Sequence, residues 1–174
     1  MIREMLFALG AGAAMAADAA DIAAVSGLAA DWAQSYASQA LAQGAPLTGA
    51  QVAIARKVGV REPSKVRVQV VEELPAPQDP VLVAAAGRIG LMPQAASGMT
   101  LGYAVLLKRG AEKDARLLSH ELRHVAQYEE KGGIRPFLAV HIPQLMQFGY
   151  EDSPFERDAR AHETRGDQAP AMPG

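Results

Sequence analysis

Residues 117–128 read LLSHELRHVAQY, and the rest of the chain can be interpreted around this stretch. Positions i and i+4 of an α-helix lie on one face, so His120 and His124 can offer two imidazole nitrogens to one metal ion. Glu121 lies one step round the helix, where its carboxylate can take a proton from metal-bound water. The pattern predicts a metal-binding helix that carries its own general base.

The apolar residues of this stretch support the helix. Leu118, Leu122 and Val125 recur at i, i+4 and i+7 and form a stripe on a neighbouring face. Asp114 can cap the helix start, and the glycine pair at 132–133 can end it. We expect the stripe to pack into the core while the histidines face a cleft. The competing interpretation is an amphipathic helix whose histidines are four apart by chance.

Composition narrows the range of functions. A chain of 174 residues, 49% hydrophobic and 21% charged, suits one globular domain with a substantial core. Its formal net charge is −2, so we expect no nucleic-acid partner. The chain contains no cysteine, which excludes disulfides and thiolate ligands. Only histidine and carboxylate side chains remain as metal ligands.

The N-terminal segment has two interpretations. Residues 5–17 are an apolar run rich in alanine, and residues 14–16 resemble a small-residue cleavage site. Glu4, however, cancels the charge of Arg3 beside a run that is too short to span a bilayer. We therefore expect a retained helix in a cytoplasmic protein without stable membrane insertion. The alternative is export directed by residues 1–16.

Local signals place further elements. Residues 13–42 have the apolar spacing of an amphipathic helix, and a Thr48–Gln51 capping box predicts a second helix that ends at Val58. Residues 65–71 alternate like a half-buried strand. Prolines indicate loops at 74–80 and 93–98 and a short helix at 80–86 capped by Asp79. A further helix is predicted at 134–150, which Pro143 should kink or split and Gly149 should end. His141, among apolar residues of that last helix, is predicted to be a packed or surface histidine.

Residues 99–108 are rich in β-forming residues and are predicted to form one strand, with Gly102 as a bulge or a point of close approach. The strand lies just before the histidine helix. A strand that borders a metal cleft can bind an extended peptide along the sheet edge. The alternative is an ordinary buried strand.

A catalytic zinc usually has three protein ligands and an open position, so the two histidines leave one ligand to find. Residues 153–156 read Ser-Pro-Phe-Glu, a typical helix start, in which Glu156 is either a capping-box glutamate or the ligand. The rival ligands lie beside or within the same helix: Glu151, Asp152, Asp158 and His162. Spacing alone does not choose among them.

At these residues the chain resembles a known family. A His-Glu-x-x-His motif followed by a glutamate on a later helix is similar to the gluzincins, the zincin metallopeptidases with a glutamate ligand. More closely, residues 100–163 resemble small, largely uncharacterised bacterial proteins predicted to be zinc metallopeptidases, which share a Pro-x-Glu-x-Asp/Glu-Ala element, here residues 154–159. The interval between His124 and Glu156 is longer than in the best-known gluzincins.

The resemblance implies His120, His124 and Glu156 as zinc ligands and Glu121 as the catalytic base. It implies that Asp158 orients a histidine from outside the ligand set. The expected fold is α+β and zincin-like, with helices packed on a small sheet and the His-Glu-x-x-His helix lining the cleft. The expected function is cleavage of a peptide or protein substrate through attack by zinc-bound water.

We expect one domain over residues 1–174, with a mainly helical part at 1–60, a catalytic core at 65–165 and a flexible tail at 166–174. Arg123, Tyr103 and Tyr150 are candidates to stabilise an oxyanion, and the sequence assigns the role to none of them. Two other functions fit the sequence. One is a non-catalytic, zinc-stabilised protein-interaction domain, and the other is a helical interaction module whose motif is accidental.

Overall fold

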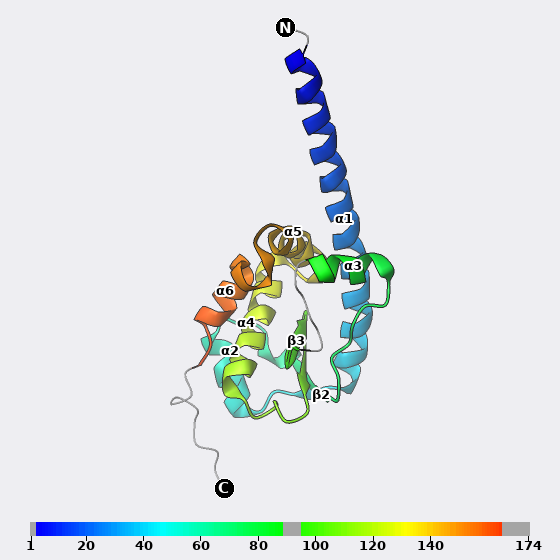
Figure 1. The fold of residues 1–174 in the computed structure, drawn as a ribbon. Helices are drawn as coiled ribbons and strands as arrows, with labels where there is room; N and C mark the ends of the chain where they lie inside the picture. Colours follow the sequence, from blue (N-terminus) through cyan, green and yellow to red (C-terminus); the bar gives the residue numbers. More distant parts are fainter. Residues whose placement is uncertain (1–2, 89–94, 165–174) are drawn as a thin grey trace.

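A computed structural model describes residues 3–88 and 95–164. Within them the chain forms an α+β fold of six α-helices, one 3₁₀ turn and four strands. The elements in chain order are α1 (Arg3–Gln43), β1 (Ala45–Pro46), α2 (Gly49–Lys57), η1 (Pro63–Lys65), β2 (Arg67–Val71), α3 (Pro80–Arg88), β3 (Gly98–Leu101), β4 (Ala104–Lys108), α4 (Ala115–Lys131), α5 (Ile134–Asp152) and α6 (Pro154–Ala161). Figure 1 shows α1 extending at its N-terminal end beyond the other elements.

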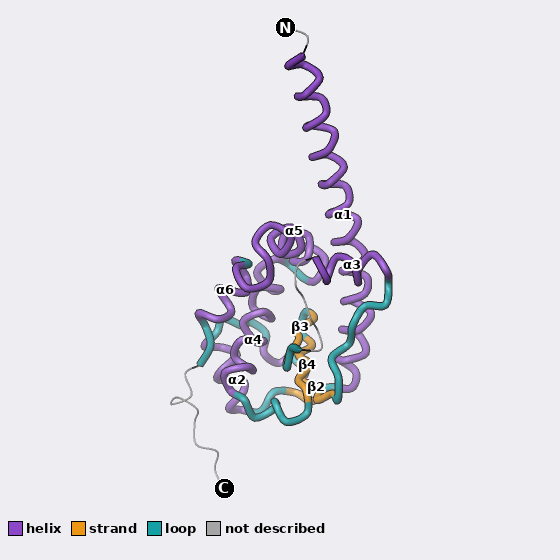
Figure 2. Tube along the Cα trace, in the orientation of Figure 1, coloured by secondary structure: helices purple, strands orange, loops and turns teal. Residues whose placement is uncertain are grey.

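The four strands form one mixed sheet in the order β1-β2-β4-β3, in which β2 and β4 are parallel and the other pairs antiparallel. Helices surround this small sheet (Figure 2). Alternate residues of β4 enter two hydrophobic clusters: Ala104 and Leu106 pack with α1, whereas Val105 and Leu107 pack with α2 and α4. Both faces of β4 are therefore buried, which anchors α4 against the sheet.

Residues 99–108 form a hairpin, so the prediction of one continuous strand was wrong. β3 and β4 pair antiparallel, with Leu101 opposite Ala104, and Gly102 and Tyr103 make the turn. Gly102 has φ +64°, as the first central position of a type II′ turn requires. Its predicted close approach is confirmed, because a Cβ there would lie 3.2 Å from Ile134.

The strand predicted at 65–71 is shorter, because η1 occupies residues 63–65. Its expected half-buried face is only partly formed: Val66 is fully buried, whereas Val70 is 39% exposed. The cluster with α2 and α4 contains Val66 and the partly buried Val68 and ends before Val70.

Most helix ends follow the predicted signals. Both hydrogen bonds of the Thr48–Gln51 capping box are present. The Asp79 carboxylate accepts from the backbone amides of Val81 and Leu82 at the start of α3. Contrary to expectation, helix α5 is not split at Pro143, but its path breaks at Gly149, the predicted stop, with φ 74° and ψ 174°.

Some expectations fall on residues outside the description. Residues 1–2, 93–94 and the predicted tail at 166–174 are among them. From Arg3 onward the N-terminal segment is part of α1, in agreement with the predicted helix. Among the described helices, none combines the length and apolar character needed to cross a membrane.

Candidate metal centre

Helix α4 has the register that the sequence predicts. Asp114 caps its start by accepting from the amides of Arg116 and Leu117 at 2.9 and 3.0 Å, and Gly132 ends it in the left-handed conformation with φ 89°. The apolar stripe of this helix is buried in the cluster with β4: Leu118, Leu122 and Val125. The histidine face is thereby turned toward α6.

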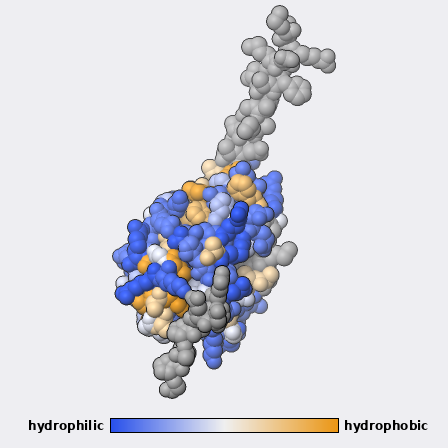
Figure 3. Space-filling model, turned by 90° about the vertical axis from the view of Figure 1, so that its left-hand side faces the viewer, coloured by the Kyte–Doolittle hydropathy of each residue, from blue (hydrophilic) through white to orange (hydrophobic). Residues whose placement is uncertain are grey.

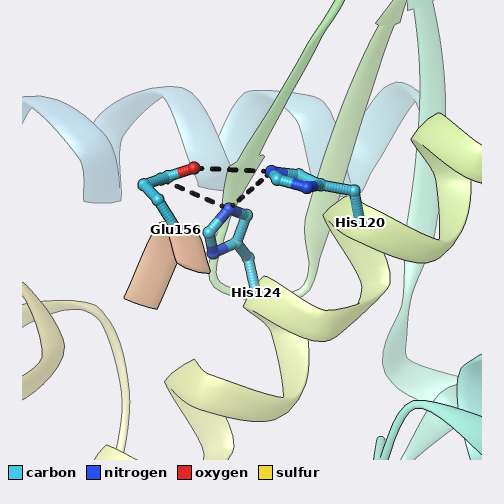
Figure 4. Close-up of side chains that lie close together, drawn as sticks. All are labelled: His120, His124 and Glu156. Carbon is cyan, nitrogen blue, oxygen red and sulfur yellow. Dashed lines mark hydrogen bonds and ion pairs between the residues drawn. The ribbon is translucent and has the colours of Figure 1, made fainter. Parts of the chain in front are cut away.

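Three side chains from α4 and α6 converge at one point (Figure 4). His120 Nε2 and His124 Nε2 lie 3.2 Å apart. Glu156 Oε2 lies 3.5 Å from His120 Nε2, and Glu156 Oε1 lies 3.4 Å from His124 Nε2. The three side chains are 12%, 10% and 4% exposed. Among the described residues this is the only group of three histidine, aspartate or glutamate side chains close enough to hold a metal ion.

These separations suit a metal ion. Ligand atoms about 2.0–2.1 Å from a tetrahedral zinc lie roughly 3.3 Å from one another. The two histidine nitrogens match this separation, and with one oxygen of Glu156 the three candidate ligand atoms all lie within 4.8 Å of one another. Glu156 Oε2 is also buried without a hydrogen-bond partner among the described residues. A buried carboxylate oxygen without a donor is costly unless a cation satisfies it. The residues therefore fit a bound metal ion.

Helix α6 distinguishes the two interpretations of Glu156. Ser153 is the residue before the helix, but its side chain makes no capping hydrogen bond, and the Glu156 carboxylate faces the histidines. The rival side chains are turned elsewhere. Asp158 binds Arg123 at 2.6 Å, and the exposed His162 contacts the Asp158 carbonyl at 2.8 Å.

Hydrogen bonds to the outer nitrogens fix both imidazoles. His120 Nδ1 lies 3.1 Å from Glu163 Oε1, and a carboxylate can only accept there. His124 Nδ1 lies 2.8 Å from Gln127 Oε1. The Gln127 amide is oriented by its Nε2, which donates to Phe155 O at 3.0 Å and to Asp158 Oδ2 at 2.7 Å. Both Nδ1 atoms therefore carry a proton, which assigns the two Nε2 atoms as the nitrogens that would bind a metal ion.

The sequence interpretation missed Glu163 and Gln127. Gln127 could have been found from its i+3 spacing to His124 on one helix, whereas nothing in the sequence connects Glu163 with a histidine 43 positions earlier. Asp158, expected to orient a histidine, is placed one hydrogen bond further out. It contacts His124 only through Gln127.

Glu121 lies beside the cluster in a buried position. Its Oε2 accepts from the Thr100 hydroxyl of β3 at 2.7 Å. The carboxylate packs so closely on Gly98 that a Cβ at that position would lie 2.5 Å from Glu121 Oε1. Burial raises the pKa of the Glu121 carboxyl, and the nearby His124 and His120 oppose this rise. The glycine and the threonine thus hold a carboxyl whose proton affinity is increased.

The histidines and Glu156 shift one another's pKa values. Burial lowers the pKa of His124, but the hydrogen bond and charge of Glu156 outweigh it and raise that pKa to about 9. For Glu156, burial raises the pKa, while the two histidines bring it well below its usual range. Without a metal, the centre is therefore an ion pair between an imidazolium and a carboxylate. A metal ion would replace the shared proton.

His141 is a packed histidine near the centre, as predicted. Its ring lies 5.0 Å from Phe137 and 5.4 Å from Phe155, and burial lowers its pKa to about 4. Its Nε2 is 3.7 Å from Glu156 Oε1. Of the three oxyanion candidates, Tyr103 binds Glu62 and Arg123 binds Asp158, whereas Tyr150 lines the cavity beside Glu156.

Comparison with known proteins gives one match. The family model of the eCIS core domain matches residues 85–132, a region of 48 residues that runs from α3 through α4. This region includes His120, Glu121 and His124, and it ends before Glu156. No curated protein and no solved structure matches the chain. The similarity therefore covers the segment that carries the histidine motif, in a chain of 174 residues.

Proposed function

We propose that the protein is a zinc-dependent metallopeptidase of the gluzincin type, with a zincin-like catalytic core. The observation that carries this proposal is the convergence of two imidazole lone pairs and one buried carboxylate beside a second buried carboxyl, Glu121. Two nitrogens and one oxygen are a ligand set that suits zinc and leaves a fourth position open. A zinc ion held by His120, His124 and Glu156 would polarise a peptide carbonyl and acidify water.

Glu121 is the general base in this proposal. It accepts a proton from the attacking water and then delivers that proton to the leaving amine. The raised pKa favours this role, because the carboxyl must hold the proton between the two steps. Thr100 donates to Glu121 Oε2, which leaves Oε1 free of that bond and keeps the carboxyl in one orientation.

The edge of the sheet offers a place for the substrate backbone. Among the described strands, β3 pairs only with β4, so its other edge has no strand partner. An extended peptide could pair with this edge and lie across Glu121, which packs on β3. The Thr100 carbonyl already accepts from the Tyr128 hydroxyl at 3.2 Å, so the peptide would pair with the remaining groups of the edge.

Zinc content and hydrolysis test the proposal together. Zinc-loaded protein should cleave an unstructured protein such as casein, and Glu121→Gln should retain zinc while losing on the order of a hundredfold or more in rate. His120→Ala should lose both zinc and hydrolysis. A protein that binds zinc and becomes more stable, yet cleaves nothing, would instead fit the second candidate, a zinc-stabilised interaction domain.

A further inference from the structure

An apolar cavity opens from the metal centre toward the N-terminal helix. Its volume is about 210 Å³, and its walls come from α1, α3, β3 and α5 as well as from the centre itself. Glu121, His124 and Glu156 line one part of it, and residues of α1 and α3 line another. Figure 1 shows α1 and α3 side by side, across the fold from α6.

The side chains that line the cavity away from the centre are almost all apolar. They include Val25, Ala29, Trp32, Leu82, Leu138 and Leu145. Such a wall rejects a charged group, because burying a charge without a partner is very costly. Figure 3 shows, by contrast, that the outer face on the α6 side is mainly hydrophilic, with small hydrophobic patches.

The volume limits the occupant. An apolar cavity of about 150 Å³ is sufficient to hold a benzene molecule. At about 210 Å³ the present cavity can hold an aromatic ring or a branched aliphatic group with some space to spare. It is too small for a folded segment or a second chain.

We propose that this cavity binds one large apolar side chain of the polypeptide substrate, phenylalanine or leucine in size, next to the bond that is cleaved. The inference rests on the proposed function, since it assigns the occupant from the position of the cavity beside Glu121. A side chain reaches the cavity from a backbone lying along β3, because Gly98 and Thr100 line it. Substrate specificity therefore comes from the α1 and α3 walls of the cavity. All of α1 and most of α3 lie outside residues 85–132, which match the family model.

Trp32 provides a direct probe. It is the only tryptophan of the chain and lines the cavity, and its buried indole nitrogen has no acceptor among the described residues. Zinc-loaded Glu121→Gln protein should be titrated with peptides Gly-Gly-X-Ala-Gly, in which X is Phe, Leu, Ala or Asp. Phe and Leu peptides should change the Trp32 fluorescence saturably, and Ala should bind on the order of tenfold or more weakly. The Asp peptide should cause no change.

Two variants fill the cavity from different walls. Ala29→Leu on α1 and Ala85→Leu on α3 should each reduce the preference for Phe over Ala at least tenfold, with zinc content unchanged. Ala24→Leu, on the exposed face of α1, is the matched control and should retain the preference. Because the two substitutions lie on different helices, poor folding of one variant does not decide the result.

The outcomes separate this inference from the proposed function. Equal binding of the Phe and Ala peptides, or an unchanged Trp32 signal, would refute the cavity assignment even if wild-type protein hydrolyses casein. Tight binding of the Phe peptide by a wild-type protein that cleaves no substrate would support the cavity as an apolar binding site and refute the peptidase.

Discussion

Replacing Gln127 by methionine should weaken zinc binding without removing any ligand. Gln127 is fully buried and connects His124 Nδ1 with Phe155 O and Asp158 Oδ2. Methionine has a similar shape but cannot hold the Nδ1 proton in place, so the imidazole loses its fixed tautomer. Outer-shell partners of a metal typically contribute ten- to a hundredfold in affinity.

We expect the upper end of this range, because no water can reach a fully buried position to replace the amide. A hundredfold loss corresponds to about 3 kcal/mol. The metal-free protein should also lose stability, by roughly 1–3 kcal/mol, since buried polar groups of His124 and Phe155 lose their partner.

A competition titration against a chromophoric zinc chelator measures the affinity, and urea unfolding with excess chelator measures the stability. Gln144→Met is the matched control: it makes the same change on α5 at a side chain whose buried oxygen has no hydrogen-bond partner among the described residues. A folded Gln127→Met protein that binds zinc as tightly as wild type would contradict this role of Gln127.

Three further predictions follow from the same site. Glu163→Ala should weaken zinc binding only about tenfold. The Glu163 side chain is 18% exposed, so water can replace it at His120 Nδ1. A loss as large as that caused by removing one of the three metal ligands would contradict this. Gly98→Ala should displace the Glu121 carboxyl and suppress hydrolysis while zinc content, measured by mass spectrometry, stays near wild type; unchanged turnover would count against the placement of Glu121. Metal-free protein should become less stable as pH rises from about 6.5 through 9, because folding raises the pKa of His124. Urea unfolding should show a loss of roughly 3 kcal/mol in the free energy of unfolding over this range. An increase in stability with pH would contradict the prediction.

Helix α4 could be predicted because its signals are local. The stripe at Leu118, Leu122 and Val125 and the two histidines lie within one helix of 17 residues, and the cap at Asp114 directly precedes it. The hairpin was missed although Gly102 is a typical first residue of a type II′ turn. The continuous run of β-forming residues on both sides concealed the turn.

Apart from Glu156, which the family resemblance grouped with the two histidines, side chains brought together from distant segments could not be predicted. Glu163 reaches His120 across 43 positions, and Trp32 shares a cavity with Glu121 although they are 89 positions apart. The helix break was predicted at both Pro143 and Gly149, and only Gly149 departs from helical geometry. A proline removes one backbone hydrogen bond, which packing against α1 can offset, whereas the positive φ at Gly149 ends the helical path.

Zinc binding by wild type and by Glu156→Gln tests the central claim most directly. Wild-type protein purified without chelator should contain about one zinc, and Glu156→Gln should lose or greatly weaken it. The Glu156 carboxylate faces the histidines and no side-chain hydrogen bond caps α6, so loss of zinc would not reflect loss of the helix start. Glu151→Gln, at a side chain that is 85% exposed, is the control and should bind like wild type. Full zinc affinity in Glu156→Gln, together with its loss in Asp158→Asn or His162→Ala, would contradict the account.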